Sequence, residues 1–469
     1  MNPEATLDRV TAALKRLIEA AEPWEGLFPS MLDLDGHAML REQPPAIHGQ
    51  RDGDRAFLGS NLMHDHVVLR LMYDLDAAGL AEGCAAAADR YLQRFATHCT
   101  DTVSGLFPWG EHSFWQLVDD RVGSGHRPHE PEHAIHDHLR QAPVWLWERL
   151  WRINPTCVER FAEGLDNHWT QGEPREYIRH AFIGRRERHP RGARSCDFPR
   201  HGGFYILDWA FAWRMTGRDD FRRQIDLMLD YWWDRRLDDG TLLVESRSSD
   251  DDSSFTGIAA PSQSQSLAAS LLDTAAHIGD NGGTLAATMG ERARVYLDGF
   301  LAAPHRPEQQ VYLSTFDLAT RAPHRPMASW GSVYGCSAAG GPALLCIAAY
   351  RHTGDERLLS WAASVGGWYL AERFPSGIAV PACDAGLALE LFAALYEETG
   401  ERRWIEDGLQ RAAELSDTYF EQPLPRGAAG IDWYESQMGP GYLLHGLARL
   451  SLLAAGAQPC PVAADFTSR

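Results

Sequence analysis

The feature of this sequence that most constrains its fold is a repeated pair of helices joined by a short turn at a glycine. Three clear copies are LDWAFAWRMTG–RDDFRRQIDLMLDYWW, ALLCIAAYRHTG–DERLLSWAASVGGWYL and LELFAALYEETG–ERRWIEDGLQRAAEL. In each copy an apolar, aromatic helix precedes a more charged one. Glycine readily adopts the left-handed conformation that ends many helices, and the acidic or polar residue beside it can begin the next helix. Helical periodicity also dominates the rest of the chain, where alternating strand patterns are few.

The number of pairs predicts the architecture. Six pairs can be placed along the 469 residues, and one more helix remains near each end, at about 4–22 and 437–455. If the two end helices pair with each other, seven hairpins result. We therefore predict an all-α fold, an (α/α) toroid or barrel in which the apolar first helices form the inner wall and the charged second helices the outer wall. The six internal pairs are 62–99, 139–169, 203–234, 262–302, 338–371 and 383–419.

Two alternatives to this ring remain at the level of the sequence. Seven hairpins are favoured over six, since element boundaries from sequence alone are imprecise. An open α-solenoid would stack the same hairpins without closing, but solenoid repeats are usually more regular than these. We expect one (α/α)-barrel domain over residues 1–469, with long loops at the rim formed by the N-termini of the inner helices.

Composition excludes several function classes. A hydrophobic content of 44% is ample for a core, and a formal net charge of −20 argues against nucleic acid as a partner. No stretch reaches about 18 uninterrupted apolar residues, which argues against a membrane-spanning helix. The first residues lack the apolar core of a signal peptide, and the eight cysteines show no CxxC, so we expect a cytoplasmic protein with reduced thiols. The oligomeric state stays open.

The long connections into the first helix of each pair carry most of the unusual residues. In a ring these connections reach one end, where they converge above the N-termini of the inner helices. Helix N-termini carry partial positive charge and unpaired N–H groups, so this mouth favours an anion. The connections contain GSNLMHDH (59–66), GLFPWGEHSFW (105–115), EHAIHDHLRQ (132–141), DFPRHGGFY (197–205), PSQSQS (261–266), SWGSVYGCSAAGG (329–341) and DWYESQMGPGY (432–442).

A locally basic segment supports an anionic ligand. From Glu173 to His201 there are eight arginines against four acids, within a strongly acidic chain. Arginine suits carboxylates because its planar fork can bind them in bidentate fashion. The competing interpretation is a solvated loop whose arginines pair with the acidic surface. Arg200 abuts a helix entrance, and there we favour a functional role.

Five stretches carry a resemblance to a known family. GSNLMHD, LFPWGEH, HDHLRQ, FPRHGGFYI and YESQMGPG, with the hairpin layout, resemble α/α-toroid polysaccharide lyases that act on uronic-acid glycans, in particular the glucuronan and alginate lyases of polysaccharide lyase family 38. The resemblance covers most of the chain. It implies a carbon–oxygen lyase that cleaves an anionic oligo- or polysaccharide by β-elimination. Many such lyases are exported, and the missing signal peptide therefore favours imported oligosaccharides as substrate.

A uronate lyase must neutralise the C5 carboxylate, abstract the adjacent proton and protonate the departing O4. Preorganised donors aimed at the developing charge usually contribute most to catalysis. Arg200 and Asn61 could bind the carboxylate, with Gln263 or Gln265 assisting. Because such side chains can supply the neutralisation, we predict no metal and no other cofactor.

The predicted acid and base come from histidine and tyrosine. His201 is a plausible base or carboxylate partner, since the pKa of histidine can lie near neutrality. Tyr205 follows His201 by one helical turn, and Tyr334 lies among small residues. Nearby arginines would favour the phenolate and so lower the pKa of such a tyrosine. The residues do not decide between the two tyrosines, so the predicted catalytic set is Arg200, His201, Tyr205 and Tyr334.

Further polar and aromatic residues near the mouth are expected to contact substrate. Glu111 could orient His112, and Trp109 either stacks on a sugar or packs in the core. The His-x-His pairs at 64/66 and 136/138 do not favour a metal, because on a helix such a pair points to different faces and no third ligand has diagnostic spacing. The predicted substrate-binding set is Asn61, His64, Trp109, Glu111, His112, His136, Gln263, Gln265, Tyr434 and Glu435.

Three other functions fit the same scaffold. A glycoside hydrolase would need paired carboxylates, for which Asp65, Glu111, Asp208, Asp384 and Glu435 are available. An isomerase of the N-acylglucosamine 2-epimerase kind also uses a helical toroid and histidines. A non-catalytic sugar-binding ring is the third, but a scaffold does not need His, Tyr and Arg gathered on one rim.

Overall fold

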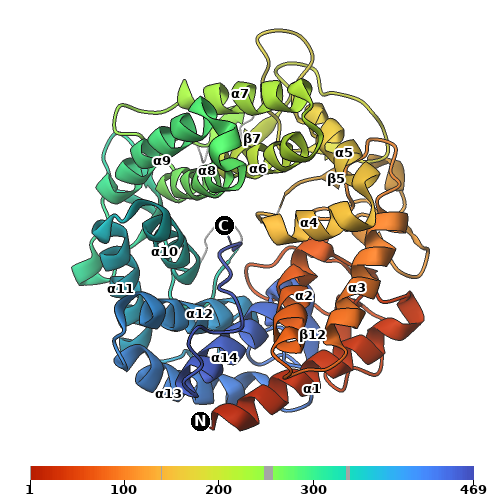
Figure 1. The fold of residues 1–469 in the computed structure, drawn as a ribbon, viewed down its shortest axis with the longest axis vertical. Helices are drawn as coiled ribbons and strands as arrows, with labels where there is room; N and C mark the ends of the chain where they lie inside the picture. The colour runs from red at the N-terminus through yellow and green to blue at the C-terminus, as the bar shows by residue number, and fades with distance from the viewer. Residues whose placement is uncertain (1, 139, 248–256, 334–337, 469) are drawn as a thin grey trace.

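The helices of this chain form a closed ring around an open centre (Figure 1). The computed structural model describes residues 2–138, 140–247, 257–333 and 338–468. Within these residues seven helices line the centre: α2 (Leu62–Ala77), α4 (Val144–Ile153), α6 (Pro199–Thr216), α8 (Pro261–Gly282), α10 (Gly340–Thr353), α12 (Ala382–Thr399) and α14 (Pro440–Ala454).

Seven further helices form the outer wall. They are α1 (Pro3–Ala21), α3 (Cys84–Arg94), α5 (Pro155–Gly164), α7 (Asp219–Trp233), α9 (Thr284–Ala302), α11 (Glu356–Ala371) and α13 (Arg403–Tyr419). The first helix packs against the last, and α14 also packs against α2, so the end of the chain returns to its beginning. The predicted all-α toroid of seven hairpins is confirmed, and this closure rules out the open solenoid.

The glycine turns have the conformation that the sequence predicts. Gly217, Gly354 and Gly400 follow α6, α10 and α12 with φ angles of 70°, 68° and 68°. Each donates its N–H to a carbonyl in the last turn of the helix before it, which satisfies one of the acceptors exposed at a helix end. A β-carbon is disfavoured at such angles, so glycine sets the length of these three inner helices.

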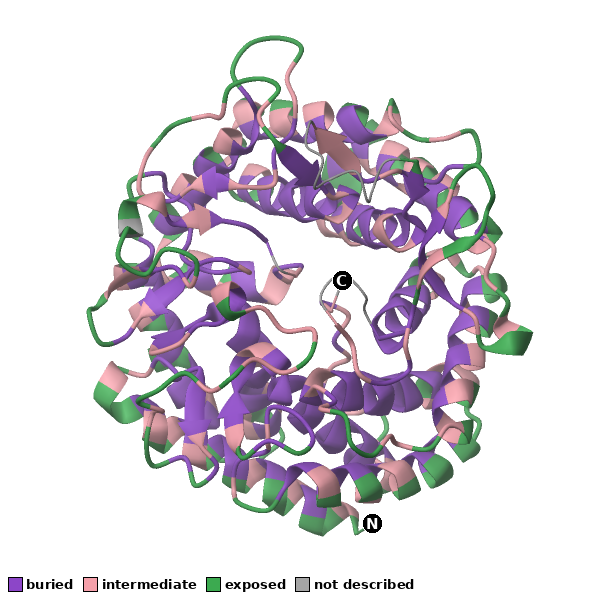
Figure 2. Ribbon diagram, turned by 180° about the vertical axis from the view of Figure 1, so that it is seen from behind, coloured by how far each residue is buried: buried purple, intermediate pink, exposed green. Residues whose placement is uncertain are grey.

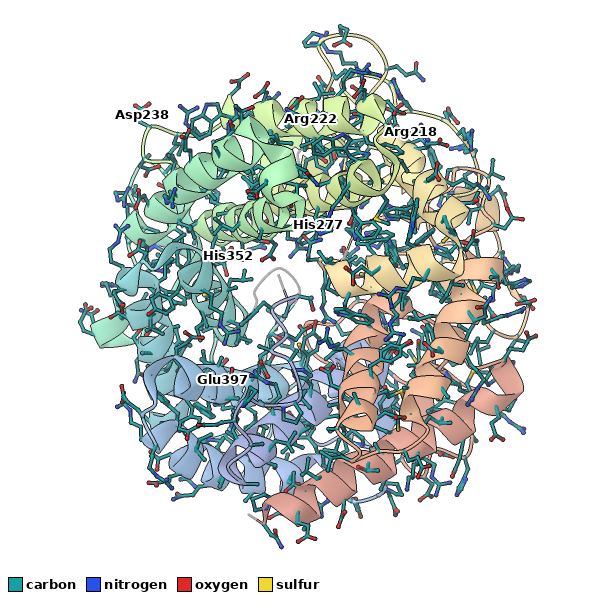
Figure 3. All side chains as sticks on the ribbon, viewed as in Figure 1. Arg218, Arg222, Asp238, His277, His352 and Glu397 are labelled. Atoms are coloured by element: carbon teal, nitrogen blue, oxygen red, sulfur yellow. The ribbon has the colours of Figure 1, made fainter. Side chains whose placement is uncertain are left out.

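Burial separates the two walls. The inner helices other than α4 are buried around most of their circumference, whereas α4 and the outer helices bury one stripe and expose the other (Figure 2). Ion pairs lie along the exposed stripe. In α7, for example, Arg222 Nε lies 3.1 Å from Oδ2 of Asp226, one helical turn further on. Arg218 and Arg222 accordingly lie at the outer edge of the ring (Figure 3).

Short antiparallel strands connect the long loops at one end of the ring. They are too short to form a layer of their own, and each sheet joins segments that are distant in sequence. The strands are β1 (Met31–Asp33) with β12 (Trp433–Glu435); β2 (Gly59–Ser60), β3 (Phe114–Gln116) and β4 (Arg121–Gly123); β5 (Ile135–His136) with β6 (Ala181–Phe182); β7 (Ser195–Asp197) with β8 (Glu245–Arg247); and β9 (Ile258–Ala259), β10 (Leu313–Asp317) and β11 (Pro323–Pro326).

Residues 455–468 leave α14 and enter the central opening, where the C-terminus is labelled in Figure 1. The Thr467 hydroxyl lies 2.8 Å from His66 Nε2 and 3.3 Å from the Tyr442 hydroxyl. Residues 464–467 line a cavity that also touches His277 and His352, which Figure 3 labels beside the centre. Ser468 lines a different cavity at the rim, so this segment separates the two.

Among the described residues, no helix combines the length and the apolar character that crossing a membrane requires.

Candidate active site at the rim of the ring

A cavity of about 480 Å³ opens where the long connections meet the first turns of the inner helices. Arg200 and Gln263 reach it from the first turns of α6 and α8, and Gly341 and Asp384 from those of α10 and α12. The convergence that the sequence predicts is therefore present. A volume of this size falls within the range of small-molecule sites.

Cationic groups outnumber anionic groups around this cavity. Five arginines line it, at positions 51, 140, 179, 200 and 325, against three carboxyl groups, Asp54, Glu111 and Asp384. One of the arginines, Arg51, is paired with Asp54 at 3.5 Å. In a chain of net charge −20 such a wall is a local exception, and it would attract an anionic ligand.

Arg179 and Arg200 share one aromatic support. Their guanidinium carbons lie 4.9 Å and 5.6 Å from the centre of the Phe198 ring. The backbone N–H of Arg200 donates to Gln263 Oε1, and Arg200 Nε has no hydrogen-bond partner among the described residues. Two guanidinium groups are thus held at the mouth of α6, and Arg200 Nε is a donor that a carboxylate could accept from.

Most other arginines of the basic segment pair with nearby acids. Arg175 lies 3.0 Å from Glu173, Arg185 lies 3.1 Å from Glu187, and Arg188 bonds to Asp166. These pairs match the competing interpretation of a solvated loop. Of the eight arginines in this segment, only Arg179 and Arg200 line the cavity.

A histidine and an arginine lie at the inner end of the cavity. His64, in the first turn of α2, is buried, and its Nε2 has no hydrogen-bond partner among the described residues. Burial lowers the pKa of His64 well below the usual value, and the charges of Arg140 and His66 lower it further. The imidazole is therefore neutral at neutral pH. The Arg140 guanidinium lies 4.8 Å from the centre of the Tyr442 ring.

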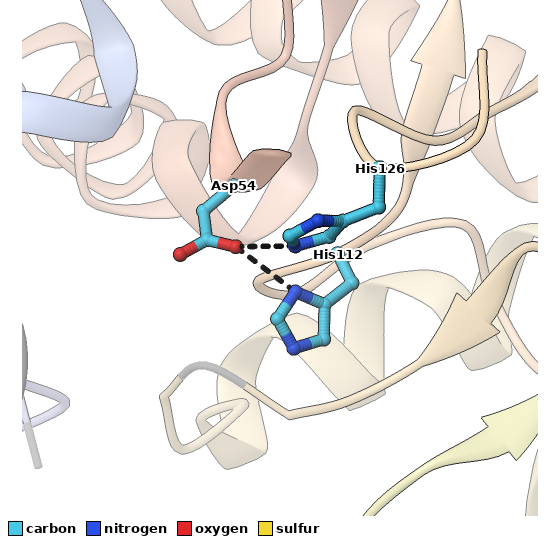
Figure 4. Close-up of side chains that lie close together, drawn as sticks. All are labelled: Asp54, His112 and His126. Atoms are coloured by element: carbon cyan, nitrogen blue, oxygen red, sulfur yellow. Dashed lines mark hydrogen bonds and ion pairs between the residues drawn. The ribbon is translucent and has the colours of Figure 1, made fainter. Parts of the chain in front are cut away.

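A group of buried titratable residues adjoins the cavity at Glu111. Burial and the charge of Asp137 raise the pKa of Glu111 to about 7. His112 lies between three acids, with Nε2 3.5 Å from Glu111 Oε2 and Nδ1 3.1 Å from Asp54 Oδ1. His126 Nε2 contacts the same Asp54 oxygen at 3.0 Å, as Figure 4 shows. Burial raises the pKa of Asp54, but the hydrogen bonds from the two histidines outweigh it and bring the pKa to about 2.

Asp137, whose charge acts on Glu111, faces three imidazoles. Its carboxylate oxygens are 3.5 Å from His112 Nε2, 3.4 Å from His180 Nε2 and 3.6 Å from His201 Nε2. Two sets of side chains in this region have ligand atoms close enough together to hold one metal ion: Asp54, His112 and His126, and His112, Asp137 and His180.

His201 and Tyr205 lie behind the cavity wall. Their ring centres are 6.5 Å apart, so both face the same side of α6, but each side chain is buried. The expectation that arginines lower the pKa of Tyr205 is wrong: burial and the charge of Asp137 raise it well above the usual value. The physical reason is that desolvation disfavours the phenolate more than the distant guanidinium groups favour it. Tyr334 lies outside the described residues.

Several residues predicted to bind substrate are engaged in the protein itself. Trp109 Nε1 donates to His136 Nε2, and His136 Nδ1 lies 2.9 Å from His168 Nε2, all in the core. Asn61 caps α2 by accepting the N–H of Met63. These positions stabilise the wall of the ring, and the cavity lining does not include them.

The same holds for three further predicted residues. Gln265 donates to the carbonyl of Pro342 at 2.8 Å and is buried. Glu435 is buried in a bidentate ion pair with Arg55, and Tyr434 beside it is buried as well. Of the predicted substrate-binding set, His64, Glu111 and Gln263 line the cavity, and His112 adjoins it through Glu111.

Asp54, Asp137 and His180 were not among the site residues predicted from the sequence. Asp137 lies within the quoted His-Asp-His stretch, so its flanking histidines were an available signal. His180 lies in the basic segment, where the arginines dominate the pattern. Nothing in the sequence distinguishes Arg179 from the other seven arginines of the basic segment.

No protein-family model matches the chain, and no curated protein matches it. Among solved structures it is similar to a family 76 glycoside hydrolase (mannosidase) from Bacteroides thetaiotaomicron, at 12% identity over 96% of this chain and 99% of that one, with a TM-score of 0.45. An unsaturated glucuronyl hydrolase from Bacillus sp. GL1 has 13% identity over 94% and 96%, with a TM-score of 0.45. A D-mannose isomerase has 10% identity over 76% and 95%, with a TM-score of 0.48. Similarity at this level carries no inference about the reaction, which rests on the residues of the site itself.

Proposed function

We propose that this chain is an enzyme that cleaves uronic-acid-containing glycans of the glucuronan or alginate type by β-elimination. The observation that carries the proposal is the pair of guanidinium groups, Arg179 and Arg200, held on the Phe198 ring at the wall of a cavity that also contains a neutral histidine. Arginine binds planar carboxylates well, and every uronate residue carries one.

The reaction needs the carboxylate at C5 to be neutralised, because the adjacent C–H is otherwise too weak an acid. Arg179 and Arg200 would bind this carboxylate and stabilise the negative charge that develops when the proton leaves. The C5–H electron pair then forms the C4=C5 double bond, and the C4–O4 bond breaks. The departing O4 takes a proton, either the one accepted by the base or one from water.

His64 is the base that the described residues favour. It lines the cavity, its Nε2 has no hydrogen-bond partner there, and its lowered pKa keeps it neutral and able to accept a proton. Binding of an anion beside Arg140 would offset the charge that now lowers the pKa of His64 and make it a stronger base. Tyr334 stays a predicted acid or base.

A glycoside hydrolase is the second candidate, favoured by one specific observation. Asp54, Glu111 and Asp384 line the same cavity, and hydrolysis of a glycosidic bond uses two carboxyl groups on opposite sides of it. The two reactions differ in their products. Elimination creates a conjugated double bond in the new non-reducing end, whereas hydrolysis does not.

The test is to incubate the purified protein with glucuronan, alginate and pectate oligomers and to follow ultraviolet absorbance and reducing ends together. A rise in both on one substrate is the expected result. New reducing ends without absorbance would replace the lyase by the hydrolase, and an epimerised sugar without cleavage would replace it by an isomerase. No change on any uronate would overturn the proposal.

A further inference from the structure

We propose that His112, Asp137 and His180 form a binding site for one divalent transition-metal ion, with zinc as the probe that identifies it. His112 and Asp137 lie in the connection between α3 and α4, His180 lies in the connection between α5 and α6, and their ligand atoms all lie within 4.8 Å of one another. The site is independent of the proposed reaction. It also differs from the His-x-His pairs in the sequence, because only the folded connections bring its members together.

The distances around Asp137 are those of ligands on a common ion. Asp137 Oδ2 lies 3.5 Å from His112 Nε2 and 3.4 Å from His180 Nε2. Hydrogen bonds between such atoms are shorter, with N···O distances of about 2.7–3.2 Å. Two ligands bound at the usual zinc distances with a tetrahedral angle lie about 3.4 Å apart, which matches the spacing here.

The lack of hydrogen-bond partners for several of these atoms also supports a bound cation. Both oxygens of Asp137 and Nε2 of His180 are buried and have no hydrogen-bond partner among the described residues. Burying a carboxylate without partners is costly. A proton on His112 would give Asp137 a cationic partner but leave His180 Nε2 without one, whereas one cation bound by the three residues would satisfy Asp137, His112 and His180 together.

The neighbouring set of Asp54, His112 and His126 needs no ion. There Asp54 Oδ1 lies 3.1 Å from His112 Nδ1 and 3.0 Å from His126 Nε2, both ordinary hydrogen-bond lengths (Figure 4). Asp54 instead acts on the proposed site through His112. A carboxylate that accepts the Nδ1 proton fixes the tautomer and aims Nε2 outward, the arrangement that metal-binding histidines usually show.

Two more groups surround the site. His201 Nε2 lies 3.6 Å from the other oxygen of Asp137, and Glu111 Oε2 lies 3.5 Å from His112 Nε2. Glu111 also lines the rim cavity, so it links the site to the space where a ligand would enter. Three protein ligands leave a tetrahedral ion one further position, which water or a ligand can take.

The experiment is metal binding by the full chain. After removal of bound metal with a chelator, the protein is titrated with Zn²⁺ against a competing chromogenic chelator, and with Co²⁺ while visible absorption is recorded. We expect one equivalent of Zn²⁺ per chain and Co²⁺ bands typical of four-coordinate nitrogen and oxygen ligation. Asp137→Asn and His180→Gln should each remove this binding, and Asp54→Asn should weaken it by about 10–100-fold.

The matched control is His98→Gln, since His98 also pairs with a carboxylate, Asp120 at 2.9 Å, but lies on the exposed surface. It should bind Zn²⁺ as the unchanged protein does. Circular dichroism of each variant establishes that it is folded, and His180, which is partly exposed, is the variant least dependent on core packing. The proposal is overturned if the unchanged protein takes up no Zn²⁺, or if folded Asp137→Asn and His180→Gln bind it with unchanged affinity.

Discussion

Arg55 donates two parallel hydrogen bonds to Glu435, from Nε to Oε1 and from Nη2 to Oε2, each 2.7 Å long. Both side chains are fully buried. The pair joins the connection before α2 to the connection before α14, and so ties the first and last parts of the ring together beside the cavity. Gln50, which lines the cavity, also donates to Glu435 at 2.8 Å.

Breaking the ion pair of Arg55 and Glu435 should reduce the stability of the folded protein. In Arg55→Met the Glu435 carboxylate stays buried without its cation, and we expect the free energy of unfolding to fall by about 3–5 kcal/mol. Urea denaturation measures it. Arg402→Met, which breaks an exposed pair with Glu406, is the control and should cost about 1 kcal/mol or less. Equal losses in the two variants would show that the buried pair has no special role.

Arg200 should be essential for turnover but not for folding. Arg200→Gln removes a charge that would stabilise the developing carbanion, and loss of one such donor typically lowers kcat by about 10²–10³-fold. The measurement is the initial rate on the uronate substrate that the panel identifies. Arg175→Gln, in the same segment but paired with Glu173 outside the cavity, should leave the rate unchanged. An unchanged rate in folded Arg200→Gln would contradict the assignment of this arginine.

Asp65 should make stability depend on pH. Burial raises the pKa of Asp65 from 3.8 to about 7, although the hydroxyls of Tyr91 and Ser60 act against the rise. Between these values the folded state retains a proton that the unfolded state has lost. The contribution of Asp65 to the free energy of unfolding should therefore fall as pH rises from about 4 to 7, by an amount on the order of 4 kcal/mol, and level off above.

The variant Asp65→Asn isolates this effect, because it removes the titrating group and retains the shape. Tyr91, which donates to Asp65, and Tyr434 both have pKa values raised well above 10 by burial, so neither ionises in this range. Unfolding curves at several pH values give the comparison. A decline with pH that is as steep in the variant as in the unchanged protein would rule Asp65 out as its cause.

Two glycines in helices should respond in opposite directions to alanine. A β-carbon at Gly386 of α12 would lie 2.2 Å from the backbone of Tyr442 in α14, where nothing can move aside. Gly386→Ala should therefore destabilise the protein by about 1–3 kcal/mol through overpacking. At Gly367, an exposed position of α11, a β-carbon would meet nothing within 4 Å, and Gly367→Ala should gain up to about 1 kcal/mol. Thermal denaturation distinguishes the two, and the same sign for both would contradict the close packing of α12 on α14.

The sequence by itself determined the ring. Glycine turns such as Gly217 and Gly354 fix where several inner helices end, and most of the apolar first helices have to be buried on nearly every side. Seven hairpins of this kind have few ways to bury those surfaces other than closing on themselves. The convergence of the long connections on one rim follows from that topology, and so does the prediction that this rim attracts an anion. These properties depend on local conformation and on the hydrophobic pattern, and both can be inferred from the order of residues in the sequence.

Only the tertiary structure decided which rim residues reach the cavity. Tyr205 and Trp109 lie in motifs that look functional, but both are buried, and Asn61 and Gln265 are used as structural hydrogen-bond partners. Arg179 is one of eight arginines in its segment, and only the folded structure places it on the Phe198 ring at the cavity wall. A side chain's role depends on what other segments place around it, and on whether burial or a nearby charge dominates its pKa. The cluster of His112, Asp137 and His180 shows this directly, because its members are 25 or more residues apart in sequence and meet only where two connections fold together.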